Sequence, residues 1–235
     1  MADVDEVKFG AVLMQFARTL VGDYQVADML EELCDHVGDV LPVDGAGVML
    51  ADENGVLRFV AASDEIVRHI ETLQSDLGEG PCLHAYNSGE QVVIADFGDS
   101  ERFPGFGPRA LQSGLSAVYS FPMRVGDDHI GALNLYRATP GRLQIEEIEA
   151  GQVLADIATI YILNARQVER SARLSDQLEH ALQSRVVIEQ AKGKLAEQRH
   201  IDVVEAFERL RGYARRNSRK LHDVAAAVVN DGLRL

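Results

Sequence analysis

Six basic residues lie between positions 209 and 220, without an intervening acid, and a tyrosine stands among them. Guanidinium and ammonium groups at this density bind the phosphates of a polyanion, and an aromatic ring can stack on an unpaired base. The alternatives are a solvated helical surface for the charges and a half-buried rim position for the tyrosine. The candidate nucleic-acid contacts in this stretch are Arg209, Arg211, Tyr213, Arg215, Arg216, Arg219 and Lys220.

A second candidate group precedes this cluster on a predicted helix. Arg185 and Lys192 share one helical face with Glu189, and Gly193 lies beside them. A glycine inside a helix costs about 1 kcal/mol relative to alanine. Close approach of an RNA backbone would explain Gly193, and so would close packing of another helix. We therefore add Arg185, Lys192 and Gly193 to the candidate RNA contacts.

The charge of the chain is unevenly distributed. The 235 residues carry a net charge of −14, which alone argues against a nucleic-acid partner. However, residues 165–235 hold 14 Lys and Arg against 10 Asp and Glu, a net of +4, so the acidic excess belongs to residues 1–164. This asymmetry predicts a polyanion partner for the basic end.

Cys82 is the candidate sensor residue of the acidic part. It follows Gly80-Pro81 at a predicted helix start, where the helix dipole favours a thiolate, and His84 is close in sequence. This pair could sense an oxidant or hold an unidentified small ligand; the alternative is a small buried cysteine. The only other cysteine, Cys34, is distant in sequence. No metal-ligand spacing, known cofactor or nucleophile–base pattern is found, so we predict no metal site and no enzyme.

Up to about residue 143, the predicted helices and strands that must position these residues indicate an α+β domain. Residues 7–21 and 24–41 are predicted helices, and the hairpin strands 45–52 and 56–63 flank the turn signal Asn54-Gly55. Asp64 is expected to cap the next helix. A short strand is predicted at 91–97, a loop at 100–109, and strands 116–125 and 130–138 flank a second hairpin turn. Helices segregated around antiparallel strands predict an α+β sandwich rather than a nucleotide-binding α/β fold.

Residues 144–198 contain no proline and predict one very long helix or two abutting helices. An a/d spacing predicts a parallel coiled coil between two chains; the alternative is a helix that spans solvent alone. The a/d positions are Ile157, Ile160, Asn164, Gln167, Ser171, Leu174, Leu178 and Ala181. A further helix should start after Asp202 and bury Val203, Phe207, Leu210 and Ala214. The inner face of a last helix should consist of Leu221, Val224, Ala225, Val228 and Val229.

The C-terminal residues resemble an ANTAR domain, a family that binds RNA stem-loops and prevents a transcription terminator from forming. The resemblance rests on residues 184–193, 205–215 and 219–225 and covers about 178–232. Lys194 and Ala196 depart from the family pattern, in which Ile or Val and Met are frequent. His200 stands where a turn glycine is common. The resemblance implies an RNA-binding three-helix bundle.

Residues of about 20–165 resemble a GAF domain, in the form found ahead of ANTAR in actinobacterial regulators. The resemblance rests on residues 48–52, 60–63, 78–82 and 131–136, and it implies a sensory domain with an unidentified ligand. We therefore predict a GAF-like domain at 1–165, a helical linker at 166–177 and an ANTAR domain at 178–235. The acidic start and the lack of an apolar run of about 18 residues predict a cytoplasmic protein without a membrane partner.

The predicted function is a homodimeric RNA-binding transcription antiterminator, regulated by the GAF domain, that recognises paired stem-loops. The alternative is a ligand- or redox-responsive regulator that binds a partner protein and does not bind RNA directly. A redox enzyme centred on Cys82 and a helix-turn-helix DNA-binding protein are weaker hypotheses.

Overall fold

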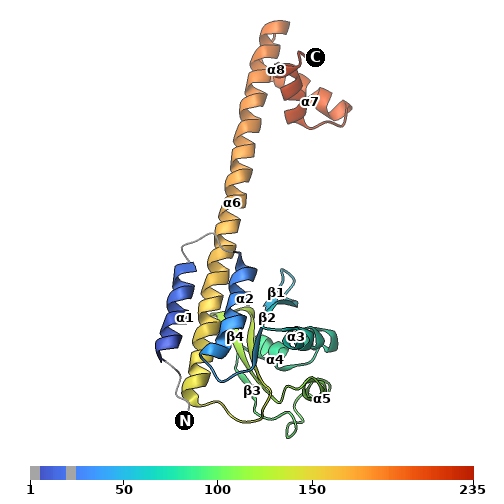
Figure 1. Ribbon diagram of the computed structural model, residues 1–235. Helices are drawn as coiled ribbons and strands as arrows, with labels where there is room; N and C mark the ends of the chain where they lie inside the picture. Colours follow the sequence, from blue (N-terminus) through green and yellow to red (C-terminus); the bar gives the residue numbers. More distant parts are fainter. Residues whose placement is uncertain (1–5, 20–24) are drawn as a thin grey trace. The chain divides into compact units, whose positions relative to one another are not determined.

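The computed structural model describes residues 6–19 and 25–235 (Figure 1). The chain divides into two compact units, residues 1–165 and residues 166–235. Within the described ranges, none of the helices combines the length and the apolar character that a bilayer crossing requires.

The first unit is built on one five-stranded antiparallel sheet. Its strands follow the order β2-β1-β5-β4-β3. They are β1 (Gly45–Ala51), β2 (Leu57–Ala62), β3 (Val92–Ile94), β4 (Ala117–Val125) and β5 (Asp128–Arg137). The predicted α+β class is confirmed, and the central strands are buried on both faces.

Helices cover both faces of this sheet (Figure 1). Helices α1 (Glu6–Thr19) and α2 (Val26–His36) pack on one face with the first part of α6 (Ile145–Arg199), over a core that includes Leu30, Phe121 and Leu154. The other face carries α3 (Glu65–Leu77), α4 (Pro81–Ser88) and α5 (Gly107–Gln112). The sheet therefore separates two apolar cores.

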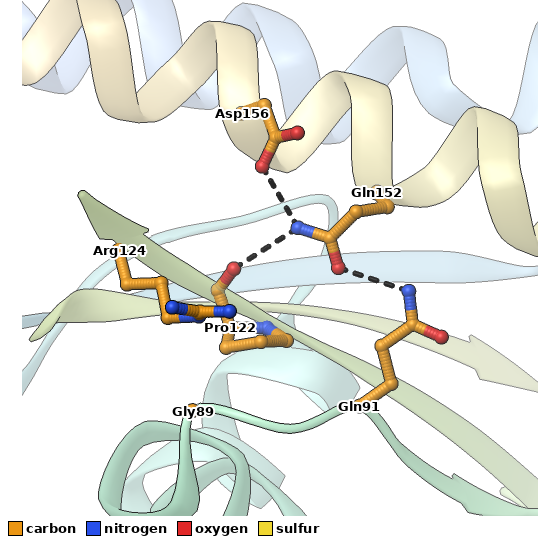
Figure 2. Close-up of a pocket in the computed structure, with 6 residues that line it drawn as sticks. All are labelled: Gly89, Gln91, Pro122, Arg124, Gln152 and Asp156. Carbon is orange, nitrogen blue, oxygen red and sulfur yellow. Dashed lines mark hydrogen bonds between the residues drawn. The ribbon is translucent and has the colours of Figure 1, made fainter. Parts of the chain in front are cut away.

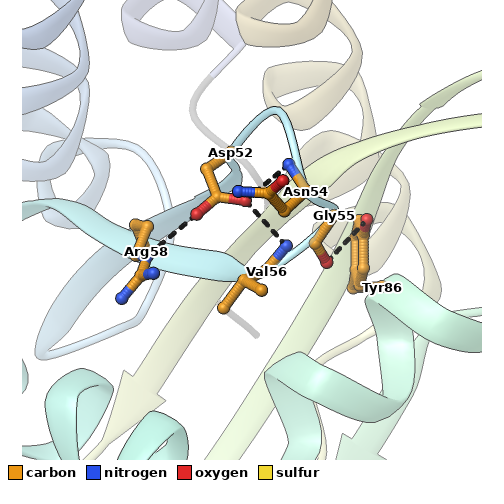
Figure 3. Close-up of polar contacts among 6 residues, drawn as sticks. All are labelled: Asp52, Asn54, Gly55, Val56, Arg58 and Tyr86. Carbon is orange, nitrogen blue, oxygen red and sulfur yellow. Dashed lines mark hydrogen bonds and ion pairs between the residues drawn. The ribbon is translucent and has the colours of Figure 1, made fainter.

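The first hairpin turns where the Asn54-Gly55 pair predicts it (Figure 3). The Asp52 carboxylate accepts hydrogen bonds from the backbone amides of Val56 (3.0 Å) and Asn54 (2.9 Å) and from Nε of Arg58 (3.1 Å). These contacts, the Val56 amide foremost, lower the pKa of Asp52. Gly55 adopts a positive φ of 76°, which favours glycine. The Tyr86 hydroxyl donates to the Gly55 carbonyl and ties the turn to α4.

Four predicted segments differ from the structure. Residues 20–24, where two predicted helices meet, lie outside the described residues, and α2 ends at His36, followed by the 3₁₀ turn η1 (Val37–Asp39). The predicted strand at 91–97 is only the three residues of β3. Part of the predicted loop 100–109 is helical, because α5 begins at Gly107 with a proline in its first turn. Strand β5 begins at Asp128, so the second hairpin turn is tighter than expected.

The second unit is a small helical bundle. Helices α7 (Val203–Arg216) and α8 (Leu221–Asn230) pack with the last part of α6. The predicted cap is present, because the Asp202 carboxylate accepts from the Glu205 amide at 2.7 Å. The buried core consists of Ala191, Leu195, Ala206, Leu210, Ala214, Val224, Ala225 and Val228. The prediction that Val203 is buried is wrong: the α7 stripe runs through Ala206, Leu210 and Ala214 at a spacing of four, and Val203 is 51% exposed.

Lys194 joins α6 to α8. Its ammonium Nζ donates to the carbonyl of Val229, in the last turn of α8, at 2.9 Å. Cations near a helix C-terminus interact favourably with the helix dipole. At this position, where Ile or Val is frequent in the ANTAR pattern, Lys194 therefore makes a polar contact with the end of the last helix.

The C-terminal ends of α6 and α7 are each followed by a residue other than glycine in the left-handed conformation. His200 has φ 56° and Ser218 has φ 51°. The Ile201 amide donates to Ala196 O (3.1 Å) and the Arg219 amide to Ala214 O (2.9 Å), the six-to-one bond of a Schellman motif. Such a backbone costs a side-chain-bearing residue about 1–2 kcal/mol.

We expect His200→Gly to stabilise the second unit by about 0.5–1 kcal/mol, because the relief of left-handed strain exceeds the added freedom of the unfolded chain. Native-state hydrogen exchange of the Leu210 amide would measure the gain. Gln198→Gly, two residues earlier inside α6, is the matched control and should destabilise the bundle. Equal losses in the two variants would contradict the backbone assignment.

Candidate functional site

Four predicted contacts form a free basic corner at the end of α7. Arg215 and Arg216 occupy its last turn, Arg219 and Lys220 lead into α8, and all four are exposed. No ion pair of these four side chains is found in the part of the chain that the structure describes. The Arg216 guanidinium lies over Gly212, where an added Cβ would stand 3.2 Å from Nη1. We call Arg215, Arg216, Arg219 and Lys220 the basic corner.

The two earlier arginines of α7 have acidic partners on their own helix. Arg209 pairs with Glu205 at 2.9 Å and Arg211 with Glu208 at 3.7 Å, and all four side chains are largely exposed. Exposed pairs of this kind contribute only about 0.3–0.5 kcal/mol. A phosphate could displace either glutamate, but the positive field of Arg209 and Arg211 is weaker than that of the basic corner.

Lys192 is held against α7. Its Nζ pairs with the Glu189 carboxylate at 2.8 Å and lies 5.6 Å from the centroid of the Phe207 ring. The side chain is only 18% exposed. The structure thus brings Lys192 to α7, whereas Arg185 is exposed on α6 without a described contact to the basic corner.

Gly193 and Tyr213 have different surroundings. Gly193 is exposed, and a Cβ added there would meet nothing within 4 Å, so close helix packing does not explain this glycine within the chain. The Tyr213 ring is half-buried against the core of the bundle. Part of the ring therefore serves the fold, and only its exposed part is available to a base.

Cys82 and His84 do not form a common pocket. Cys82 is completely buried, and burial, together with the charge of Glu71, raises the pKa of its thiol well above the usual value. These surroundings fit the alternative, a small buried cysteine, and are unfavourable for a thiolate, because desolvation disfavours the charged form of the thiol. His84 is exposed and contacts the edge of Phe103. Cys34 is also buried, but in the core on the opposite face of the sheet.

Sequence reasoning missed a buried polar cluster beside Cys82. The carboxylate of Glu71 is fully buried and accepts from Asn134 Nδ2 (2.8 and 2.9 Å), from the Tyr136 hydroxyl (3.1 Å) and from Gln74 Nε2 (3.1 Å). Gln74 Oε1 in turn accepts from the Cys82 amide at 2.9 Å. The signal in the sequence was the position of Glu71 and Gln74 on the same α3 stripe as Val67 and Ile70.

A second polar feature lies where β4 and the segment before β3 face α6 (Figure 2). It is a hollow of about 480 Å³ lined by Gly89, Gln91, Pro122, Arg124, Gln152 and Asp156. Gln152 Nε2 donates to Pro122 O (3.1 Å) and Asp156 Oδ1 (2.9 Å), and Gln91 Nε2 donates to Gln152 Oε1 (3.0 Å). The polar groups that line the hollow therefore form most of their hydrogen bonds with one another. The described residues include no cluster of three or more His, Cys, Asp or Glu side chains arranged for a metal ion.

Comparison with known families assigns both parts of the chain. A family model described as "GAF domain" matches residues 24–162, and one described as "ANTAR domain" matches residues 176–229. No curated protein matches the chain. GAF and ANTAR are regulatory domains rather than catalytic ones. The actinobacterial type stays a prediction.

Solved structures show the same fold as the first unit. The GAF domain of a phosphoenolpyruvate-protein phosphotransferase from Coxiella burnetii is 15% identical, with 71% of this chain and 99% of that chain covered and a TM-score of 0.57. Free methionine-R-sulfoxide reductase from Neisseria meningitidis is 16% identical, with coverages of 72% and 96% and a TM-score of 0.55. The nlh2 GAF domain of A. aeolicus is 18% identical, with coverages of 67% and 96% and a TM-score of 0.51.

We expect Gly193→Ala to stabilise the helical unit by about 1 kcal/mol, because the new methyl group meets open space and alanine favours the helix. The matched control is Gly151→Ala in the same helix, whose Cβ would stand 2.5 Å from Cζ of Phe121. That variant should destabilise the first unit by about 1–3 kcal/mol. Urea denaturation of the full chain separates the two outcomes; a loss of stability in Gly193→Ala would refute the open surroundings of this glycine.

Proposed function

Since the chain belongs to the GAF domain family and carries an ANTAR domain, we propose that it is an RNA-binding transcription antiterminator regulated by its GAF domain. The observation that carries this proposal is the basic corner. Arg215, Arg216, Arg219 and Lys220 are exposed without an acidic partner in the described structure, although the chain as a whole has a net charge of −14. A polyanion is the partner that fits such a surface.

RNA suits this surface better than a duplex read in its major groove. Double-stranded RNA is bound through its phosphates and shape, and sequence-specific contacts fall on unpaired loop bases. The basic corner offers guanidinium groups for the phosphates, and the exposed part of Tyr213 offers a face for one loop base. A stem-loop presents both partners within a short distance, which supports a hairpin as the target.

Lys192 and Gly193 offer a further candidate contact on α6. Around Gly193 a Cβ would meet no atom within 4 Å, so this stretch of helix backbone is open to a close neighbour. Lys192 is placed beside it, and a phosphate could share its ammonium with Glu189. The weaker contacts expected from Arg209 and Arg211 follow from their pairs with Glu205 and Glu208.

A homodimer is the second part of the proposal. Every α6 side chain from residue 166 to residue 183 is exposed in the single chain. Leu174 and Leu178, two of the predicted a/d positions, are 56% and 63% exposed. An uncovered apolar stripe on a helix is stabilised by a partner helix, and a parallel coiled coil would present two ANTAR domains to paired stem-loops.

The GAF domain is the input part of the proposed regulator, and the whole protein acts in the cytoplasm, where its RNA target is found. No known cofactor is assigned to it. The burial of Cys82 makes a direct thiolate sensor unfavourable. A small ligand or another chemical signal would therefore act through the side chains around the sheet.

We expect Arg216→Ala to weaken binding of a paired stem-loop RNA about tenfold, or about 1.4 kcal/mol, and to lower the slope of log K against log salt by about one. Lys192→Ala should also weaken binding. Gel-shift titrations at several salt concentrations measure both effects. Arg173→Ala is the matched control: this exposed α6 arginine pairs with Glu169 and lies outside the ANTAR match. Unchanged affinity in both test variants, or salt-independent capture of a protein partner, would favour the protein-interaction alternative.

We expect the double variant Leu174→Ala/Leu178→Ala to weaken self-association at least 100-fold, because each truncation removes buried apolar contacts in both chains. Alanine preserves helix propensity, so helix content should stay unchanged. Sedimentation over a range of protein concentrations measures the effect. Arg173→Ala, at an outward coiled-coil position, again serves as control. A wild-type chain that sediments as a monomer would contradict the dimer.

A further inference from the structure

Glu71 is a buried carboxylate without a cationic partner among the described residues. Its exposed fraction is 0%, and the side chains that hydrogen-bond to it, Asn134, Tyr136 and Gln74, are all uncharged donors. A buried charge is normally paired with an opposite charge or neutralised by a proton. No opposite charge therefore compensates the negative charge of the Glu71 carboxylate, which leaves a proton as the usual means of neutralising it.

Backbone packs closely against the Glu71 carboxylate and the neighbouring Gln74 amide. A Cβ added at Gly47 of β1 would stand 2.4 Å from Glu71 Oε1. A Cβ added at Gly80 would stand 2.2 Å from Gln74 Oε1. The β1 backbone therefore packs directly on the Glu71 carboxylate, and the segment before α4 packs directly on Gln74. A proton needs no additional space at this carboxylate, and it would neutralise the buried charge.

The other titratable groups near Glu71 do not supply a charge. They are Cys82 of α4, Tyr136 of β5 and Cys34 of α2, and burial, as the largest cause, raises the pKa of each. All three are therefore neutral near pH 7. Burial likewise raises the pKa of Glu71 to about 7, against the smaller opposing effects of Asn134, Tyr136 and Gln74.

The cluster has a second hydrogen-bonding arrangement ready for the protonated form. Asn134 Oδ1 is buried and has no hydrogen-bond partner in the described structure. In the ionised form, Asn134 Nδ2 donates to both carboxylate oxygens. When Glu71 becomes a hydroxyl donor, rotation of the Asn134 amide by half a turn places Oδ1 where it can accept that proton. The orphaned oxygen then gains a partner.

We propose that Glu71 is a reversible proton-binding site, and that its protonation resets the hydrogen bonds that run from Asn134 through Gln74 to the Cys82 amide at the start of α4. The proton is then a chemical input of the GAF domain. When Glu71 loses its charge, the bond from Gln74 Nε2 to Glu71 weakens, and the change reaches the Cys82 amide through Gln74 Oε1. The site is independent of RNA binding, so either proposal can fail alone.

The sign of the linkage to stability follows from the direction of the pKa change. The pKa of Glu71 is raised on folding from 4.5 to about 7, so between these values the folded chain binds more protons than the unfolded chain. Stability from this group is therefore lost as the pH rises through that window, and it is constant above the folded pKa. Glu71→Gln, which stays neutral, should remove this part of the pH dependence.

The test is carbon and nitrogen NMR of the full-length protein with labelled glutamate carboxyls and backbone amides, titrated from about pH 4 to pH 9. We expect one carboxyl resonance with a midpoint near 7, and a Cys82 amide shift with the same midpoint. Glu71→Gln should abolish both, whereas Glu90→Gln, an exposed glutamate of the same domain, should leave both unchanged. Asn134→Ala should raise the midpoint by about one pH unit, because bonds to the ionised form are lost.

The wild-type titration decides the proposal even if a variant fails to fold. If every glutamate carboxyl titrates below about pH 5, as free side chains do, Glu71 is ionised throughout and the proton site does not exist. If the carboxyl titrates near 7 but the Cys82 amide does not follow, the transmission to α4 is refuted. A midpoint that falls in Asn134→Ala would overturn the hydrogen-bond arrangement.

Discussion

Helix α6 supplies core side chains to both units of the chain, and neither core is complete without it. Leu154, Ala155 and Ile162 pack on the sheet of the first unit, and Ala191 and Leu195 pack among the helices of the second. A three-helix bundle of this size would be marginal if it depended on two short helices alone. A single helix of 55 residues thus contributes to both cores. The middle segment of α6, residues 166–183, belongs to neither core and is therefore exposed.

Packing on α6 also determines which charges of α7 face outward. Ala206, Leu210 and Ala214 are small or slim side chains, and their stripe turns the arginines away from the core. Near the start of α7, Glu205 and Glu208 lie within one turn of Arg209 and Arg211 and partly neutralise them. No acid follows until Asp223, so the uncompensated charge collects at the basic corner.

Local sequence signals predicted the elements well because their causes are local. The missing prolines predicted α6, Asn54-Gly55 predicted the first hairpin turn, and Asp64 and Asp202 cap the helices that they precede. The buried cluster could not be predicted in the same way. Glu71 is stabilised by Asn134 and Tyr136, which are 63 and 65 residues away. A charged residue on a helix is normally placed on the surface, and most of the hydrogen bonds that hold Glu71 in the interior come from β5. For Cys82, the sequence left a thiolate sensor and a buried cysteine open, and only the fold shows the burial that raises the pKa of the thiol.

The tie between Lys194 and the Val229 carbonyl affects how the protein tolerates ionic solutions. Both atoms are partly buried, so mobile ions reduce this attraction less than they reduce attractions at the exposed basic corner. The bundle should keep its last helix in place under conditions that strip a polyanion from its surface. Chemical acetylation acts differently, because it removes the positive charge of the lysine itself. An acetyl group on Lys194 would remove this charge-assisted bond to the end of α8 while leaving the arginines untouched.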